Sequence, residues 1–292
     1  MVSLSKKQRS NLLLLLTAMI WGAAFVAQRE GVGMVGSFTF NAVRMNIGGL
    51  VLLPCISWLD RRNGIRNGWK TAGKDLWIGG LLCGIVLFIA SSLQQQGVAY
   101  TTAGKAGFIT ALYVIFVPIC GLFMGKKPKA LLWLCVAAAA VGMYFLCMTE
   151  SFTLQRGDFL ILLGSFGFTA HILVIDYYSP KVDGVRMSCL QFFVAGILSI
   201  LPAILLETIS LSALISAAIP ILYAGVLSCG VAYTLQVVAQ KDADPTMASL
   251  LLCLESVFAV VFGWLLLGEA LSVKEFAGCA VMFAAIVAAQ FC

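Results

Sequence analysis

One acidic residue stands in the middle of a long apolar run near the end of the chain. Glu255 lies about ten residues into the apolar segment 246–267, in the stretch LLCLESVFAV. In a bilayer, an ionised carboxylate at that depth is costly, by about 2.5 to 3.5 kcal/mol on insertion scales for aspartate. Three interpretations are open. Glu255 is a proton-coupling group, or it binds the ammonium of a substrate, or it is structural, either protonated or paired with a hydroxyl such as Ser256.

Other polar or amphipathic side chains also interrupt apolar runs, and groups at membrane depth usually face the helix bundle or a water-filled cavity. Together with Glu255, the candidates for substrate contact are Trp21, Ser92, Gln95, Tyr113, His171 and Tyr233. The two tyrosines have polar tips that could orient a ligand in an apolar pocket. Each candidate also has a structural interpretation: Trp21 and His171 as packed residues, and Ser92 bonded to its own backbone. Three successive glutamines, 94–96, sweep too wide an arc to share one helix face.

A second group of residues is interpreted as structural. Arg44 lies about two turns inside the outer end of the apolar segment 36–59, where it either anchors an anionic group or pairs with a helix-end carbonyl. The second role is favoured. Gly121 and Gly125 have the spacing of a close helix approach, and Gly268 and Glu269 form a comparable corner in LLLGEALS.

Catalytic, metal and cofactor chemistry are not indicated. The chain has 1 histidine and 10 cysteines, and no cysteine pair forms a C-x-x-C motif. Neither a phosphate-binding glycine loop nor an H-E-x-x-H motif occurs. We therefore expect no catalytic residue, no metal, no cofactor and no enzyme activity.

Composition places the chain in a lipid bilayer. Of its 292 residues, 61% are hydrophobic and 11% charged, against about 25% charged in a typical globular protein. The net charge of +6 does not indicate nucleic-acid binding, because the basic residues lie in short breaks between apolar runs.

The apolar runs predict an all-α integral membrane protein with ten transmembrane helices. They lie at roughly 11–28, 36–59, 76–97, 104–124, 130–149, 157–178, 187–206, 214–236, 246–267 and 272–291. With a cytoplasmic N-terminus, fourteen Lys and Arg residues fall in inside segments and four in outside segments. This bias predicts that both termini are cytoplasmic.

Two corners suggest an internal repeat. GKKPK follows the fourth apolar run and GEALS follows the ninth, so that the two corners face opposite sides of the membrane. A five-span unit that occurs twice is inverted in its second copy because five is odd. We therefore predict two inverted five-helix repeats, over residues 1–149 and 150–292, the architecture that many transporters use.

Several motifs occur in a family-specific order: IWGAAFVAQ from Ile20, an arginine in the second span, AYTTA after the third, and LLLGEALS before the last. In these features the chain resembles the EamA-type branch of the drug/metabolite transporter superfamily. The resemblance implies a ten-helix inner-membrane carrier with a substrate cavity between its halves. Two positions depart from the family pattern: Lys126 stands in place of a glutamate, and Ser256 in place of a ninth-span proline.

The favoured function is a multi-pass transporter, expected to export a small metabolite such as an amino acid by alternating access. The expected partners are a small-molecule substrate and the lipid bilayer, and proton coupling is one of the interpretations of Glu255. The alternatives are a sensory or structural membrane protein and, less favoured, a membrane-embedded enzyme on lipid-linked substrates.

Overall fold

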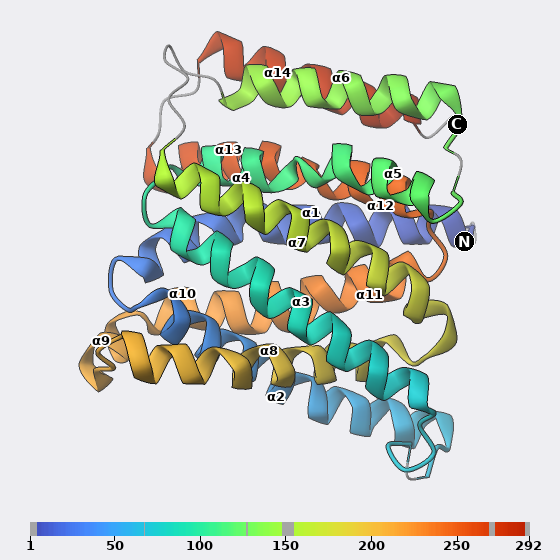
Figure 1. The fold of residues 1–292 in the computed structure, drawn as a ribbon, viewed down its shortest axis with the longest axis vertical. Helices are drawn as coiled ribbons and strands as arrows, with labels where there is room; N and C mark the ends of the chain where they lie inside the picture. The colour runs from blue at the N-terminus through green and yellow to red at the C-terminus, as the bar shows by residue number, and fades with distance from the viewer. Residues whose placement is uncertain (1–4, 67, 127, 148–154, 269–271, 290–292) are drawn as a thin grey trace.

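A computed structural model describes residues 5–66, 68–126, 128–147, 155–268 and 272–289. This part of the chain is helical and contains no strand (Figure 1). In chain order the longer helices are α1 (Lys6–Val32), α2 (Ser37–Asn63), α3 (Lys74–Val98), α4 (Ala103–Ala111), α5 (Tyr113–Phe123), α6 (Ala130–Cys147), α7 (Arg156–Tyr178) and α8 (Gly184–Leu206). The short turn η1 (Ser179–Lys181) separates α7 from α8. After α8 come the short helices α9 (Leu211–Ser216) and α10 (Ala218–Leu222) and the π-helical segment η2 (Tyr223–Tyr233). The chain ends with α11 (Thr234–Gln240), α12 (Pro245–Leu252), α13 (Leu254–Leu267) and α14 (Val273–Ala289).

Eight helical stretches are long and apolar enough to cross a membrane. Four of the eight are built from consecutive helical elements: α4 with α5, α7 with the 3₁₀ turn η1, α10 with η2 and α11, and α12 with α13. Two further apolar helices, within α6 and α14, are shorter. Large apolar side chains such as Phe123 and Ile219 are exposed on the outside of the protein, as expected for a surface that faces lipid. The chain is therefore a multi-pass membrane protein.

The helices of the two halves pack in matching pairs. Helix α2 lies against α8, and α6 lies against α14 as a separate pair at the upper edge of Figure 1. Helix α3 contacts α7 and α8, while α1 and α2 both contact η2. Helix α1 also packs on α13, as α7 packs on α4 and α5. Each of these contacts thus has a counterpart when the two halves are exchanged.

Glycines allow some of these helices to approach closely. A Cβ at Gly80 or Gly84 of α3 would overlap the side chain of Leu190 or Val194 on α8. At Gly121 the nearest neighbouring atom would be 3.7 Å away, so the predicted close approach there is wrong. Gly125 (φ 80°) has a different role, because it ends the turn after α5 in the left-handed region that favours glycine.

The second corner has the same backbone conformation. Gly268 ends α13 with φ 68° and ψ 21°, and its N–H donates to Gly263 O. The residue that follows it, Glu269, lies outside the described residues. Gly125 and Gly268 therefore end two helices in the same way, at the ends of the two broken spans.

The breaks within those two spans are also alike. Leu112 separates α4 from α5 with φ −58° and ψ −14°, and Cys253 separates α12 from α13 with φ −62° and ψ −14°. Each break leaves backbone groups without their usual helical partners, which is tolerated in a membrane where the backbone is buried in protein or lines a cavity. The two breaks therefore indicate a buried site between these spans.

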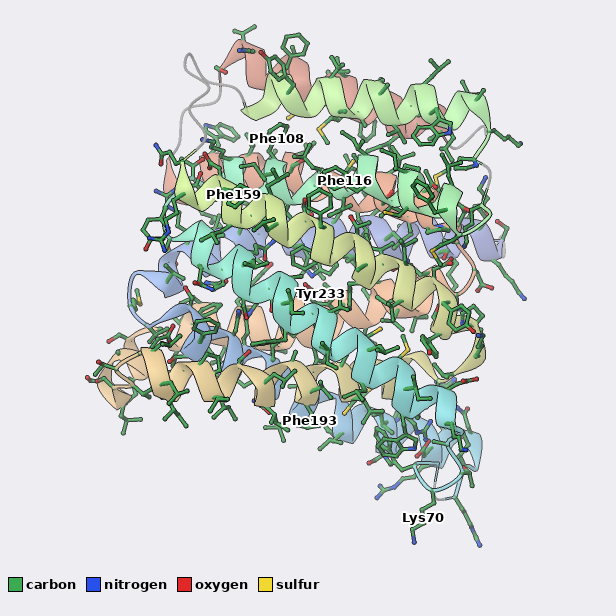
Figure 2. All side chains as sticks on the ribbon, in the orientation of Figure 1. Lys70, Phe108, Phe116, Phe159, Phe193 and Tyr233 are labelled. Atoms are coloured by element: carbon green, nitrogen blue, oxygen red, sulfur yellow. The ribbon has the colours of Figure 1, made fainter. Side chains whose placement is uncertain are left out.

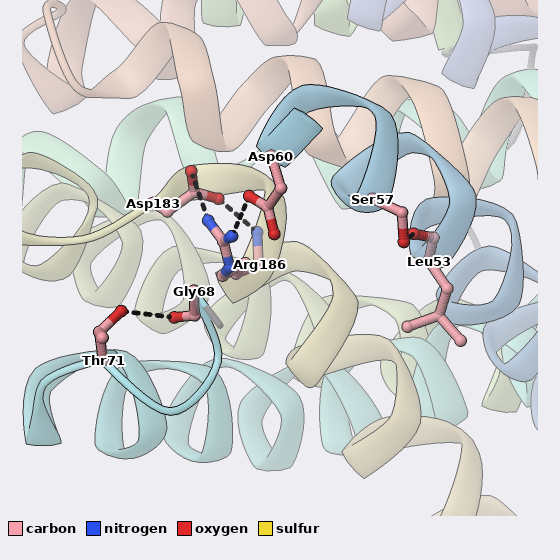
Figure 3. Close-up of polar contacts among 7 residues, drawn as sticks. All are labelled: Leu53, Ser57, Asp60, Gly68, Thr71, Asp183 and Arg186. Atoms are coloured by element: carbon pink, nitrogen blue, oxygen red, sulfur yellow. Dashed lines mark hydrogen bonds and ion pairs between the residues drawn. The ribbon is translucent and has the colours of Figure 1, made fainter. Parts of the chain in front are cut away.

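Ion pairs and caps hold the helix ends. One end of the bundle, where α2 ends and α8 begins, is called the basic end. There Arg186 of α8 contacts Asp60 of α2 and lies 3.2 Å from Asp183 (Figure 3). At the other end of the same helix pair, Glu207 accepts hydrogen bonds of 2.8 Å from the backbone N–H groups of Phe38 and Thr39. These contacts fix α2 against α8 at both ends.

Two lysines tie α7 to the fourth span. Lys105 of α4 lies 2.6 Å from Asp158 at the start of α7. Lys126, which departs from the family pattern, lies 2.5 Å from Asp176 near the end of α7. The departure at Lys126 therefore keeps an ion pair at this corner, with α7 supplying the acid.

Candidate functional site

A small cavity lies at the centre of the helix bundle, with a volume of about 30 Å³, enough for a water molecule, which needs ~10–15 Å³. It collects side chains from α1, α2, α3, α4, α5, α7, η2 and α13. The lining residues are Trp21, Phe25, Gln28, Arg44, Gln94, Thr110, Tyr113, Phe168, Ser228, Tyr233 and Glu255. Four of the predicted substrate-contact residues, Trp21, Tyr113, Tyr233 and Glu255, are thereby brought together.

Glu255 is paired across the cavity with a residue of the other broken span. The Tyr113 hydroxyl donates a hydrogen bond of 2.8 Å to Glu255 Oε1, and both side chains are buried. Tyr113 is the first residue of α5, and Glu255 is the second residue of α13. The Ser256 hydroxyl, named above as one possible partner of Glu255, donates instead to Cys253 O at 2.7 Å. Both ends of the Tyr113–Glu255 bond are fixed directly after a helix break.

An aromatic cluster forms another part of the wall. The rings of Trp21 and Tyr233 lie 4.5 Å apart between centroids, and Trp21 Nε1 donates to Ser228 O at 3.4 Å. Tyr233 lies near the middle of the molecule (Figure 2). The carbonyl that Trp21 reaches belongs to the π-helical segment η2. This agrees with the general tendency of π-helical turns to occur at functional sites.

His171 packs behind this cluster and is not on the cavity wall. Its ring lies edge-on to Tyr233 at 5.8 Å, and its Nε2 is 2.8 Å from Gln191 Oε1. The structure thus links His171 to the cavity only through Tyr233, and a direct substrate contact stays a prediction.

The third span turns a different glutamine toward the cavity from the one predicted. Gln94 lines the wall and donates to Thr110 Oγ1 at 2.9 Å, whereas Gln95 donates to Gln28 O at 3.2 Å. Successive residues are about 100° apart on a helix, so the two glutamines point in different directions. Ser92 is buried but does not line the cavity either. Gln95 and Ser92 thus do not line this cavity, and their contact with a substrate stays a prediction.

Arg44, interpreted from the sequence as structural, lies on the cavity wall. Its side chain is 2% exposed, Nε donates to Asn41 Oδ1 at 2.8 Å, and the guanidinium lies 5.7 Å from the centroid of the Phe40 ring. Nη2 has no hydrogen-bond partner among the described residues. The cavity therefore holds a guanidinium and a carboxyl group.

Sequence reasoning also missed Phe25 and Gln28. They follow Trp21 by four and seven residues, the spacing that puts side chains on one face of a helix. Once Trp21 is a candidate, this spacing identifies the other two. Thr110 precedes Tyr113 by three residues and carries a similar signal, whereas Ser228, five residues before Tyr233, does not.

A larger cavity, of about 400 Å³, opens at the basic end of the bundle. It lies where the start of α1, the segment before α6 and the start of α12 meet, and Lys7, Lys129, Asp242 and Asp244 are among its lining residues. Asp244 also caps α12 through the Thr246 N–H at 2.9 Å.

Comparison with known proteins gives a consistent result. The EamA-like transporter family is matched twice, over residues 8–148 and 155–289. A protein of Archaeoglobus fulgidus named an uncharacterized transporter is 29% identical over 283 residues, 97% of this chain and 86% of its own. The uncharacterized transporter YoaV of Bacillus subtilis is 20% identical, covering 89% of each chain. One solved crystal structure superposes with a TM-score of 0.77 at 16% identity, over 97% of this chain and 96% of its own, which shows a shared fold.

Proposed function

This chain belongs to the EamA-like transporter family, and from that premise we propose that it carries a small metabolite, such as an amino acid, by alternating access. The central cavity between the two halves is the substrate site. Transport is outward, across the cytoplasmic membrane, and both chain termini are cytoplasmic. The two family matches, the relatives named as transporters and the basic bias of one membrane side support this proposal.

The architecture that goes with this function has ten transmembrane helices. They form two inverted five-helix repeats, over residues 1–149 and 150–292, and α6 and α14 are the fifth and tenth spans. The matching packing of the two halves supports the repeat. So do the breaks at Leu112 and Cys253 and the left-handed glycines Gly125 and Gly268. Broken helices that meet at the interface of repeats are a common way to build a transport site.

One observation carries the proposal: the Tyr113–Glu255 hydrogen bond joins the two broken spans at the cavity. A buried carboxyl group is a costly way to hold two helices together, because an apolar contact of similar size is often as stable. In a carrier, the two halves must respond to whatever occupies the space between them. A hydrogen bond between the halves at that place provides such a response.

Alternating access requires the cavity to open, because 30 Å³ is too small for a metabolite. The polar contacts that close each end are then the ones that must break in turn. At the outer end these are the Lys105–Asp158 ion pair and the hydrogen bond from Arg29 to Thr101 O. At the basic end they are the Lys126–Asp176 ion pair and the hydrogen bond from Ser10 to Ala239 O.

Glu255 supplies the proton coupling in this scheme. Burial away from water disfavours the ionised carboxylate, while an opened cavity would hydrate and ionise it. On the return step without substrate, Glu255 takes up a proton from the outer side as the cavity closes and releases it to the cytoplasm when the cavity opens there. The inward movement of protons then drives the outward transport of substrate. The Tyr113 hydroxyl is present as a hydrogen-bond donor in either protonation state.

The experiment is transport by the purified full-length chain in proteoliposomes. Radiolabelled amino acids and other small metabolites are offered singly, and counterflow is measured with and without an imposed pH gradient. Saturable counterflow of at least one compound, absent from protein-free vesicles, is the expected result. A chain that moves no compound of a broad panel, and is stabilised by none in thermal unfolding, is not a metabolite carrier.

A further inference from the structure

One charged side chain of the central cavity has no counter-ion in the structure. Arg44 is 2% exposed, its Nη2 has no hydrogen-bond partner, and no carboxylate of the described residues forms an ion pair with it. We propose that Arg44 binds the carboxylate of the transported metabolite and so selects carboxylate-bearing substrates. This role rests on the transport function proposed above.

The guanidinium is held in place with one edge free. Its Nε donates to Asn41 Oδ1, and Asn41 in turn donates from Nδ2 to Ser91 O at 3.0 Å. Asn41 is thereby fixed against α3, and Phe40 lies beside the guanidinium. This support orients the side chain, while the Nη2 edge remains for another acceptor.

An arginine in this state lacks an anionic partner. A guanidinium keeps its charge in proteins, and a buried charge without a partner is strongly unfavourable. A purely structural arginine would use its donors on helix-end carbonyls, as Arg29 does with Thr101 O. An acceptor that arrives with the substrate completes the hydrogen bonding of Arg44 and releases that unfavourable energy on binding.

The surroundings favour a carboxylate over a phosphate. Among the residues that line the cavity, Arg44 is the one basic side chain, and Glu255 is on the same wall. A dianion would meet one positive charge and the repulsion of a carboxylate. A single planar carboxylate instead matches the fork of a guanidinium with two parallel hydrogen bonds.

The rest of the wall indicates how such a molecule would lie. Tyr233 lines the same cavity as Arg44 and Glu255. Phe25, Phe168 and Trp21 supply an aromatic surface. A substrate would place its carboxylate at Arg44, its apolar part on the rings, and any ammonium toward Glu255.

The test compares matched compounds that differ in one group. Thermal unfolding of the purified full-length protein is followed with amino acids, with their amides, with amine-free acids such as 4-methylpentanoate, and with amines such as isopentylamine. The same compounds compete in the proteoliposome assay. We expect each acid to bind at least tenfold more tightly than its amide. If the amine-free acid binds as tightly as the amino acid, the ammonium group makes no favourable contact with Glu255.

Variants then assign the preference to Arg44. Arg44→Gln should lower the acid-to-amide preference at least tenfold, toward one, and Arg44→Lys should lower it less because a charge remains. The matched control Arg62→Gln, at an exposed position outside the cavity, should keep the wild-type preference. Because a preference is a ratio within one protein, a smaller folded fraction leaves it unchanged.

Equal binding of acid and amide by the wild type overturns the role of Arg44, as does an unchanged preference in Arg44→Gln. In either case, transport of an uncharged or cationic compound would still support the carrier function. If Arg44→Gln does not fold, Arg44→Lys and the wild-type preference decide. A panel in which no compound is transported or bound counts against the carrier function itself.

Discussion

The Tyr113 hydroxyl donates a 2.8 Å hydrogen bond to Glu255 although 142 positions separate the two residues in the chain. Tyr113 is the first residue after the break in its span and Glu255 is the second after its own, so the bond joins similar places of the two family-matched segments. Its strength therefore depends on how the two halves sit against each other. A change of protonation at Glu255 and a movement of the halves are coupled through this contact.

Replacing Glu255 by glutamine keeps the shape of the side chain and removes its ionisation. We expect Glu255→Gln to lose accumulation driven by a pH gradient and to retain exchange of internal for external substrate. Accumulation and counterflow in proteoliposomes between pH 5.5 and 8.5 measure the two activities. The control is Glu30→Gln at the exposed end of α1. Wild-type affinity and wild-type pH dependence in Glu255→Gln would leave Glu255 with a structural role only.

Replacing Tyr113 by phenylalanine removes the donor and keeps the ring. The buried carboxyl group then lacks its partner, which costs about 1–3 kcal/mol for an unsatisfied polar group. Thermal unfolding of Tyr113→Phe, Glu255→Gln and the double variant forms a double-mutant cycle. We expect a coupling energy above about 0.5 kcal/mol. Strictly additive losses would mean that the hydrogen bond contributes nothing to the fold.

The aromatic wall can be tested with two tryptophans. Trp21→Phe removes the hydrogen bond to Ser228 O and part of the contact with Tyr233, and we expect at least a threefold change in the transport KM or maximal rate. Trp58, which is 57% exposed, serves as the matched control, and Trp58→Phe should transport as the wild type does. Equal kinetics for both variants would remove Trp21 from the site.

Membrane orientation can be tested at the two glycine corners. Single cysteines are placed at Lys129 and at Ser272 in a background without other cysteines, and intact cells are treated with an impermeant thiol reagent. We expect Ser272→Cys to label from outside and Lys129→Cys only after the membrane is permeabilised. Labelling of both from the same side contradicts the inverted repeat.

The glycines should divide into two groups by what surrounds them. Gly84→Val should lower the amount of folded protein sharply, because its side chain would overlap Val194. Gly121→Ala should be nearly neutral, since the closest neighbour of an added Cβ is 3.7 Å away. Gly268→Ala should lose about 1 kcal/mol through its left-handed backbone. Size-exclusion yield and thermal unfolding in detergent measure all three, and a loss in Gly121→Ala as large as in Gly84→Val would contradict the packing.

Much of the architecture follows from local pattern. Runs of about twenty apolar residues predict where helices cross the membrane, because span length is dictated by bilayer thickness. Helical segments occupy all ten predicted ranges, although eight stretches meet the length and hydropathy of a span by themselves. The corners at Gly125 and Gly268 are visible in the sequence for a similar reason. A chain that leaves a helix abruptly needs a residue free to adopt positive φ.

Glu255 was also identifiable without a structure, since a charge within an apolar run stands out by its cost alone. Its partner was not. The direction in which α5 presents Tyr113 depends on the packing of α5 against α12 and α13. The break at Leu112 turns Tyr113 toward the other half of the protein, where it meets Glu255.

The same reason explains Arg44 and the glutamines of α3. Sequence places Arg44 within a span and Gln94 beside Gln95, yet which of them borders the cavity depends on how α2 and α3 are rotated. That rotation is fixed by contacts with α7, α8 and η2, which lie far away in the chain. Periodicity determines which residues share a helix face, whereas only tertiary packing decides what that face meets.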